Sequence, residues 1–323
     1  MTGEQFSGID DYLIKRRSQR GLSQERLALE LQSYSELFAD IDSLAISRWE
    51  RGKVSPNIRR QIALIEFFSD EAHLLLSNPD FELKQLPSMS AFQKMLDQQT
   101  SYNHVMGAHP YIPSDNLNFD KVNKHADNAG QMIRWITHYH SNLTRQRENW
   151  APAFITPLVE HASTEVTFYQ VDGVLIGHII LLRVSPQILN ALLTGQMDDC
   201  ELTPAHLIDS DRAASTYILS AYLGGRHIAE DYLTHLLLSL IENPLTLALG
   251  YRARSDIGIK LMDFLTGVRV ATGEPLTDRL DGARYNGKRY AYVSFSIQRE
   301  ELLSSPLLLN LMRGSSESSE KAE

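Results

Sequence analysis

Apolar residues recur at helical spacing along the first quarter of the chain. Leu27 and Leu31 lie four positions apart, and Ile58, Ile62 and Ile65 follow one another at intervals of four and three. This period places apolar side chains on one face of a helix. The pattern therefore predicts helices over residues 8–76, within a first domain that spans residues 1–76.

The chain then changes character twice. Residues 77–118 are polar and contain prolines, which is typical of a linker, with one short helix expected at 91–99. Residues 119–148 have the pattern of one long helix, and residues 152–161 that of a short one. The second domain is expected to span 119–303.

A β-hairpin is predicted inside this second domain. Two apolar, β-branched runs at 166–171 and 175–183 are separated by Asp172-Gly173-Val174, and Asp-Gly is typical of a tight hairpin turn. The same reasoning predicts strands at 215–223, 246–252, 268–271 and 288–297, and helices at 228–242 and 256–265. The fold class is therefore an all-α N-terminal bundle followed by an α/β (α+β) domain. The segment 304–323 is rich in Ser, Glu and Lys towards its end and is expected to be a partly disordered tail.

Composition narrows the class of protein. The 323 residues carry a formal net charge of −9, and Cys200 is the only cysteine, so no internal disulfide can form. Neither a signal peptide nor an apolar run long enough to span a membrane is found, and a cytoplasmic protein is expected. His138 and His140 point apart on a helix, no acid or cysteine completes a site with them, and no metal is expected.

The basic segment 43–62 lies within the predicted helical domain of this acidic protein. Gly21 can end one helix and Ser23 can cap the next. Asp42 can cap a third helix that ends at Gly52, with Ile46 and Trp49 facing inward. This leaves a polar strip on the outer face of that helix.

The stretches GLSQERLA (21–28) and ISRWERGKVSP (46–56) resemble the phage-repressor-like, XRE-type helix-turn-helix family. The resemblance implies a DNA-binding bundle whose third helix enters the major groove. Unlike the family, the chain inserts about eight residues at 32–40, so that either the second helix is longer or an additional turn is present. The alternative is a helical bundle that contacts another protein. The residues expected to contact DNA are Gln24, Ser43, Leu44, Ser47, Arg48, Lys53 and Asn57.

The order of elements from Val166 to Ile297 resembles that of GNAT-type N-acetyltransferases, most clearly over residues 256–273. The resemblance implies an acyl-CoA ligand, held by backbone N–H groups at a turn between strand and helix. The corresponding turn here comprises Leu223, Gly224, Gly225, Arg226 and His227. Its glycines do not follow the family spacing, and the alternative is a tight turn with no ligand.

The catalytic residues of that family are not reproduced. Asp263 stands where the resemblance expects a tyrosine, and an ionised carboxylate does not protonate a leaving thiolate. Tyr222 or Tyr251 could replace it, although tyrosines on strands more often pack in a core. No residue is therefore assigned as catalytic, and the balance is against an enzyme.

Together these patterns predict a sequence-specific transcriptional regulator, with a degenerate GNAT-like domain that senses an acyl-CoA or related ligand or dimerises. The expected partners are a palindromic double-stranded DNA operator and a second copy of the chain. Two alternatives remain: an active N-acetyltransferase fused to a DNA-binding domain, and an adaptor whose second domain only dimerises or holds a partner protein.

Overall fold

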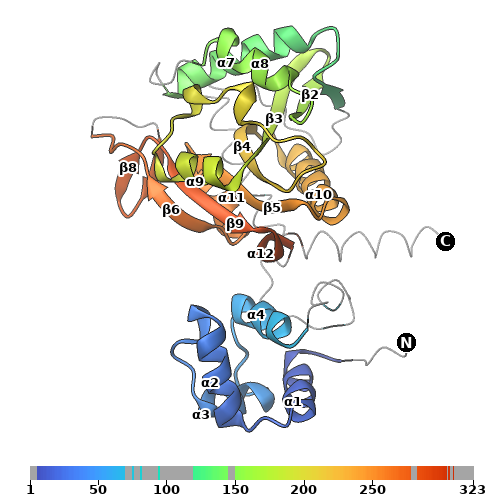
Figure 1. The fold of residues 1–323 in the computed structure, drawn as a ribbon, viewed down its shortest axis with the longest axis vertical. Coiled ribbons are helices and arrows are strands. Elements are labelled where there is room, and N and C mark those ends of the chain that lie inside the picture. The colour runs from blue at the N-terminus through green and yellow to red at the C-terminus, as the bar shows by residue number, and fades with distance from the viewer. Residues whose placement is uncertain are drawn as a thin grey trace, which may run out of the picture. The chain divides into compact units, whose positions relative to one another are not determined.

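The computed structural model describes residues 6–69, 119–144, 150–277 and 282–303, together with the single residues Leu75, Phe81, Lys94, Ser305 and Leu308. The chain divides into two compact units (Figure 1). Unit 1 comprises residues 1–88 and 304–323, and unit 2 comprises residues 89–303. Each is described by itself.

Unit 1 is helical, as the apolar period predicts. Its core is formed by side chains from every helix, among them Leu13, Leu27 and Trp49. The inserted segment 32–40 supplies both of the predicted alternatives, because the second helix is long and a 3-10 turn follows it, with Phe38 fully buried. The elements are α1 (Ile9–Gln19), α2 (Gln24–Tyr34), η1 (Glu36–Phe38), α3 (Ser43–Glu50) and α4 (Ile58–Phe68).

Side-chain caps set the ends of these helices. Ser23 Oγ accepts the Arg26 N–H at 3.0 Å, and Asp42 Oδ1 accepts the Ala45 N–H at 2.7 Å. The fourth helix begins at Ile58, and Asn57 caps it. These short-range bonds satisfy N–H groups that have no partner inside a helix.

Unit 2 is built on a seven-stranded sheet with the order β1-β2-β3-β4-β5-β9-β6. All neighbouring pairs are antiparallel except β4 and β5, which are parallel. The strands are β1 (Asp120–Asn123), β2 (Glu165–Val171), β3 (Val174–Val184), β4 (Ala214–Tyr222), β5 (Thr246–Ala253), β6 (Val268–Thr272) and β9 (Val293–Gln298), with a separate hairpin of β7 (Ala283–Tyr285) and β8 (Lys288–Tyr290).

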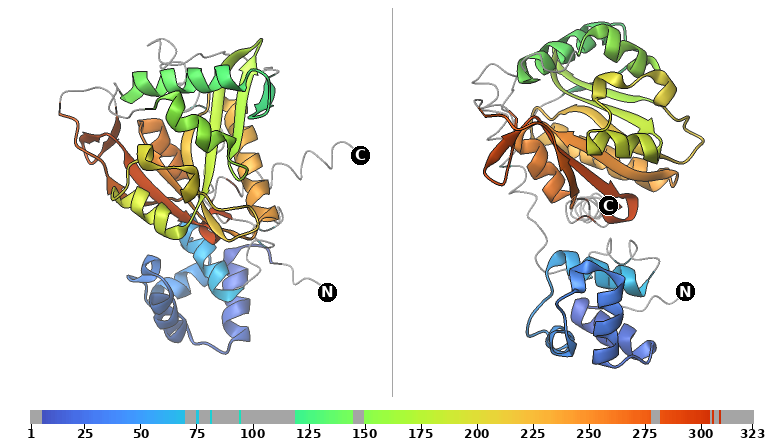
Figure 2. Two further views of the ribbon diagram at one scale, coloured as in Figure 1. Left: turned by 45° about the horizontal axis from the view of Figure 1, so that its top comes forward. Right: turned by 60° about the vertical axis from the view of Figure 1, so that its left-hand side comes forward.

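Helices cover both faces of this sheet (Figure 2). One face packs against α7 (Ala129–Thr144), α8 (Pro152–Glu160) and α9 (Pro186–Thr194) in a single apolar core. The other face packs against α10 (Arg226–Glu242) and α11 (Asp256–Phe264). The remaining elements are η2 (Asp199–Glu201), η3 (Pro204–His206) and α12 (Arg299–Leu303).

Most of the predicted elements of unit 2 are confirmed, and one is wrong. The Asp172-Gly173 turn has positive φ at both residues, as a tight hairpin requires. The single helix expected at 119–148 is instead strand β1 followed by α7, because β1 pairs with the edge of β2. The segment 288–297 is divided between β8 and β9.

Several expectations cannot be compared with the structure. Apart from Lys94, the helix expected at 91–99 lies outside the described residues, as do most of the linker and the final segment 309–323. In the part of the chain that is described, no helix combines the length and apolar character needed to cross a bilayer.

Candidate functional site

The parallel strands β4 and β5 separate partway along their length. Their pairing runs from Ala214–Thr246 to Ile218–Tyr251 and then stops, although β4 continues to Tyr222. On its other side, β4 stays paired with β3 up to Tyr222. In the described residues no strand pairs with the β5-facing edge of Leu219–Tyr222, so this edge keeps backbone N–H and C=O groups available.

A β-bulge lies at the point of separation. Ile180 pairs with Ser220 while the next residue, Leu181, pairs with Ile218, so Leu219 is an extra residue on β4. A bulge changes which face of the sheet the following side chains occupy. Tyr217 and Leu219 belong to the core under α7–α9, and after the bulge the side chain of Ser220 also lies on that face, because it bonds to α7.

Ser220 lies between two imidazoles. Its Oγ is 2.7 Å from Nε2 of His140 on α7 and 2.6 Å from Nε2 of His178 on β3. All three residues are buried. A hydroxyl has a single proton, so Ser220 donates to one imidazole and accepts from the other. The three side chains thus form a polarised hydrogen-bond chain beside the unpaired edge of β4.

Aromatic contacts connect this cluster with β5. The ring of Trp150 stacks on His140, with 3.6 Å between centroids and 5° between planes. The guanidinium carbon of Arg254, the residue that follows β5, lies 5.5 Å from the centre of the Trp150 ring. The ends of the two separating strands are therefore joined through Trp150.

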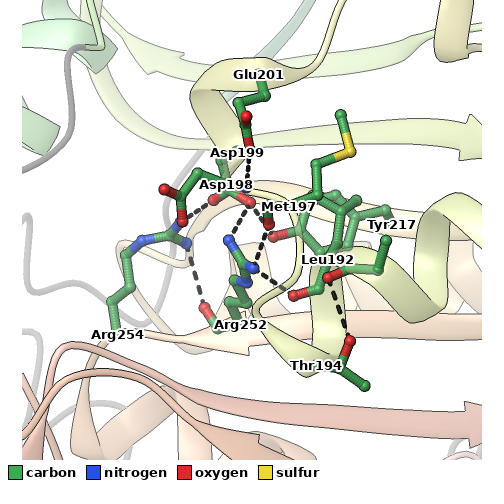
Figure 3. A network of polar contacts seen from close by, with 10 residues as sticks. Leu192, Thr194, Met197, Asp198, Asp199, Glu201, Tyr217, Arg252 and Arg254 are labelled. Atoms are coloured by element: carbon green, nitrogen blue, oxygen red, sulfur yellow. Dashed lines mark hydrogen bonds and ion pairs between the residues drawn. The ribbon is translucent and has the colours of Figure 1, made fainter.

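A buried ion cluster lies next to this contact (Figure 3). Asp199 Oδ1 accepts from Arg252 Nη1 at 3.0 Å and from the Tyr217 hydroxyl at 2.7 Å. Asp199 Oδ2 accepts from Arg254 Nη2. Arg252 also donates to the carbonyl oxygens of Leu192 and Met197.

The charged groups of this cluster are almost entirely buried. The side chains of Asp199 and Arg252 are each 1% exposed, and that of Arg254 is 9% exposed. Both guanidinium groups contact the buried Asp199 carboxylate, while the neighbouring Asp198 and Glu201 are exposed. Burial raises the pKa of the Tyr217 phenol, with the Asp199 carboxylate adding to the shift, so Tyr217 remains a neutral hydrogen-bond donor.

The glycine turn predicted as a ligand site joins β4 to α10. A Cβ on Gly224 would lie 1.7 Å from the carbonyl oxygen of Ile176, so only glycine fits there. Gly225 is different: nothing lies within 4 Å of the position of its Cβ, and its φ of 168° is ordinary extended backbone. Leu223, at the start of the turn, is buried.

The first turn of α10 offers groups to an anion. Its N-cap, Gly225, gives no side-chain hydrogen bond to the helix, so the first amides of α10 are not capped in that way. His227 Nε2 is a buried atom for which the described residues provide no hydrogen-bond partner. Amides at a helix N-terminus attract anions. A phosphate group bound at Gly225 would accept hydrogen bonds from the first amides of α10 and from His227 Nε2.

Two tyrosines lie on the α10–α11 face where β4 and β5 separate. The Tyr251 hydroxyl would be 3.2 Å from a Cβ on Gly258 of α11, and burial raises the pKa of its phenol. Burial raises the pKa of Tyr232 on α10 as well, and the nearby Tyr251 contributes to that shift. The buried Tyr232 hydroxyl has no hydrogen-bond partner among the described residues. The Tyr232 hydroxyl could therefore donate a hydrogen bond to a ligand bound on this face.

Two aspartates of α11 pair with arginines outside that helix. Asp263 is exposed and pairs with Arg269 at 2.5 Å, and Asp256 accepts the Arg284 N–H at 2.7 Å. Tyr222, the other tyrosine considered from the sequence, is half-buried at the end of β4.

The residues expected to contact DNA lie on unit 1. Ser43, Leu44, Arg48 and Lys53 are exposed and Ser47 is half-buried. The remaining two have structural contacts, because Gln24 Nε2 donates to Glu50 Oε2 at 2.6 Å and Asn57 caps α4.

Other candidate chemistry finds no support in the described residues. They contain no group of three or more His, Cys, Asp or Glu that could hold a metal ion. Cys200 is free and exposed, and partial burial together with the Asp198 carboxylate raises the pKa of its thiol, which disfavours a nucleophilic thiolate.

Sequence reasoning missed most of this site. It considered His140 only as a possible metal ligand and did not single out Ser220, His178, Arg252 or Arg254. One signal was present: Ser220, His178 and Arg252 are polar residues within apolar strands, where burial requires a polar partner.

Comparison with known proteins gives structural matches alone. No family model matches the chain, and no curated protein matches it. Among similar solved structures are FeeM, an N-acyl amino acid synthase from uncultured soil microbes (14% identity, TM-score 0.38, 60% of this chain and 97% of that one), and Arabidopsis thaliana NAA60 in complex with acetyl-CoA (14%, TM-score 0.36, 56% and 97%). An IAA acetyltransferase from Bacillus cereus is a third (12%, TM-score 0.30, 56% and 98%).

These findings correct the prediction of a DNA-binding transcriptional regulator. The solved structures reported above are named for acyl-group or acetyl-CoA chemistry, and none of them provides evidence of DNA binding. Unit 1 is helical, but nothing in the comparisons supports its assignment to the XRE-type family.

Proposed function

We propose that unit 2 transfers an acyl group from a coenzyme A thioester to an amine. The observation that carries this proposal is the separation of β4 from β5 after Ile218 and Tyr251, which leaves one strand edge unpaired. The pantetheine arm of coenzyme A is a narrow, extended chain with two amide groups. Such a chain pairs with an open strand edge in the way an additional strand does.

The turn between β4 and α10 fits the phosphates of the same donor. Gly225 has open space beside it, the amides of α10 lack a side-chain cap, and His227 Nε2 has no partner in the described residues. The turn directly follows the unpaired edge of β4. A donor extended along that edge would therefore reach both groups of contacts.

The reaction requires removal of a proton from the attacking amine. The amine nitrogen forms a bond to the thioester carbonyl carbon, and the carbon–sulfur bond breaks. Imidazole is the side chain that accepts protons near neutral pH. The His140–Ser220–His178 chain lies beside the unpaired edge, and we propose that it accepts the proton that the amine loses.

Departure of the thiolate requires a hydrogen-bond donor. Tyr251 is the last residue of β5 that pairs with β4, and its raised pKa keeps the phenol protonated at neutral pH. We propose that the Tyr251 hydroxyl donates its proton to the departing coenzyme A thiolate. The carboxylate of Asp263 does not take this role, because it is exposed and paired with Arg269.

Gly225→Asp tests the donor site in the full-length protein. Aspartate is a favoured N-cap residue and Gly225 already has extended backbone, so helix α10 should be stabilised by about 1 kcal/mol. The same carboxylate occupies the anion site and repels phosphate. We expect an unchanged or raised melting temperature, with the Kd for acetyl-CoA raised about 100-fold, equivalent to about 2.7 kcal/mol.

Gly225→Asn is the matched control, because it has the same shape and cap without the charge. It should weaken acetyl-CoA binding less than aspartate does. The readouts are calorimetric binding of acetyl-CoA and release of free thiol in the presence of a panel of amines. Full binding by Gly225→Asp, or absence of thiol release with every amine, contradicts the proposed function.

A further inference from the structure

A buried arginine of β3 has no counter-charge among the described residues, and it lines a small cavity beneath α10. We propose that Arg183, together with hydroxyl groups around this cavity, binds a monatomic anion such as chloride. The site lies in a different part of unit 2 from the acyl-transfer site, and it stands or falls independently of the proposed function.

Arg183 retains an N–H group that has no acceptor within the described residues. The residue is 6% exposed, and its Nη2 donates to the carbonyl oxygen of Arg212 at 2.6 Å. Its Nε is a buried atom for which the described residues provide no hydrogen-bond partner. A guanidinium group stays protonated in proteins, so Arg183 is a buried cation with an N–H group left to donate.

No carboxylate in the described part of the chain forms an ion pair with Arg183. Glu165 also lines the cavity, but its Oε2 lies 3.6 Å from Nε2 of His235, and its side chain is 50% exposed. Burying a cation without a nearby counter-charge is costly, and an anion that binds beside it removes much of that cost. The electrostatics at Arg183 therefore favour an anion over a neutral water molecule.

The cavity lies between the sheet and α10. Arg183 on β3 and Thr216 on β4 are register partners, and Leu236 and Ser239 of α10 line the side that faces them. The volume is about 10 Å³, which is room for one particle of about the size of a water molecule. Carboxylate, phosphate and sulfate groups contain several heavy atoms and are too large, so the ligand that fits is monatomic.

Three hydroxyl groups in the lining can donate to the same anion. They belong to Thr216, Ser239 and Thr246, and none of them forms a side-chain hydrogen bond within the described residues. A hydroxyl group can rotate to direct its proton at an acceptor. The lining thus combines a fixed positive charge with donors that adjust to the position of the ion.

This anion site lies away from the proposed donor site along the sheet. Thr216 is close to the start of β4 and Thr246 begins β5, whereas Gly225 follows the end of β4. A bound anion would connect β3, β4, β5 and α10 in the half of the sheet where β4 is paired on both sides. It would therefore act on the stability of unit 2.

The test measures thermal unfolding of the full-length protein while sodium gluconate is replaced stepwise by sodium chloride at constant ionic strength. Gluconate is too large for the cavity and serves as the reference anion. The melting temperature of the wild type should rise by about 4–8 °C between zero and about 0.3 M chloride, as expected for a Kd of about 10 mM.

Arg183→Met removes the charge and keeps an apolar side chain. In gluconate it should melt at or above the wild-type temperature, and chloride should change its melting temperature by less than about 1 °C. Arg212→Gln is the matched control, because it removes an exposed guanidinium and keeps the carbonyl oxygen that bonds to Arg183. This control should respond to chloride as the wild type does.

Thr216→Val keeps the charge of Arg183 and removes one hydroxyl group. It should raise the Kd for chloride about tenfold, since a hydrogen bond to a charged group is lost. If Arg183→Met does not fold, this variant decides, because an unchanged Kd in Thr216→Val overturns the proposal.

Two results with the other proteins also overturn it. A wild-type melting temperature that does not depend on chloride shows that water is sufficient at Arg183. An equal dependence on chloride in the wild type and in Arg183→Met shows that the anion acts elsewhere. In crystals grown with bromide, anomalous scattering should place an ion within hydrogen-bond distance of Arg183 Nε, and its absence there contradicts the site.

Discussion

The two halves of strand β4 differ in what surrounds them. Ala214–Ile218 is paired on both sides, and the Tyr217 side chain in this half anchors the Asp199 cluster. Leu219–Tyr222 is paired with β3 alone and contains the bulge and Ser220. One strand thus supplies a closed scaffold and, a few residues later, an open edge with titratable neighbours.

This difference shows how a sheet can be both stable and reactive. In the first half, the Tyr217 hydroxyl donates to Asp199 inside the protein. In the second half, backbone groups and the Tyr232 hydroxyl lack partners in the described residues. Unsatisfied groups are costly unless a ligand or water pairs with them. The contrast predicts that substitutions in the first half mainly affect stability and those in the second mainly affect function.

The largest effect is expected from Asp199→Asn. Loss of this carboxylate breaks the fully buried ion pair between Asp199 and Arg252, which costs about 3–5 kcal/mol of folding free energy. Denaturant unfolding of the purified protein measures it. The control is Asp263→Asn, where the ion pair with Arg269 is exposed and worth at most about 1 kcal/mol. Equal losses of unfolding free energy in Asp199→Asn and Asp263→Asn would contradict the structural role of the buried Asp199 cluster.

Ser220→Ala should act on the reaction more than on stability. Removing the hydroxyl between His140 and His178 interrupts proton transfer, and we expect kcat to fall about 100-fold with a changed pH profile. The matched control is Ser294→Ala, a buried strand serine whose Oγ has no hydrogen-bond partner in the described residues. A wild-type pH profile in Ser220→Ala would show that the cluster is structural.

Gly224→Ala should lower stability by about 2 kcal/mol. The added Cβ would collide with the carbonyl oxygen of Ile176, a backbone atom that cannot rotate away. Gly225→Ala, one residue later, meets no atom within 4 Å and should change stability by less than about 1 kcal/mol. Thermal or denaturant unfolding compares the two, and a reversed order would show that the turn is built differently.

The smallest effect is expected from the pH dependence of stability that the contact between His235 and Glu165 contributes. The hydrogen bond to Glu165 raises the pKa of His235 in the folded state above its value in the unfolded chain. Protonated His235 therefore stabilises the fold below the ordinary histidine pKa, and this contribution disappears as the pH rises through the folded-state pKa. Both side chains are about half exposed, so the effect should be small.

Glu165→Gln measures this contribution. Compared with the wild type, it should lower unfolding free energy at pH 5.5 and leave it nearly unchanged at pH 8.5. A difference that grows with pH has the wrong sign and would contradict the assignment.

Local signals in the sequence located much of the fold. The Asp172-Gly173 hairpin, the caps at Ser23 and Asp42, and the glycine turn at Gly224-Gly225 all depend on residues close together in the chain. The long helix expected at 119–148 was wrong because pairing with a distant strand outweighed the local period for β1. The homodimer and the palindromic operator are not tested by the structure of one chain.

By itself, the sequence determined where most helices and strands begin and end, because caps, turns and apolar periods act over a few residues. Only the tertiary structure decided that Ser220 lies between His140 and His178, and that Asp199 joins two arginines from β5 and its end. These groups come from segments separated by tens of residues. Their contacts depend on sheet order and on the bulge at Leu219, and no short-range pattern specifies either one.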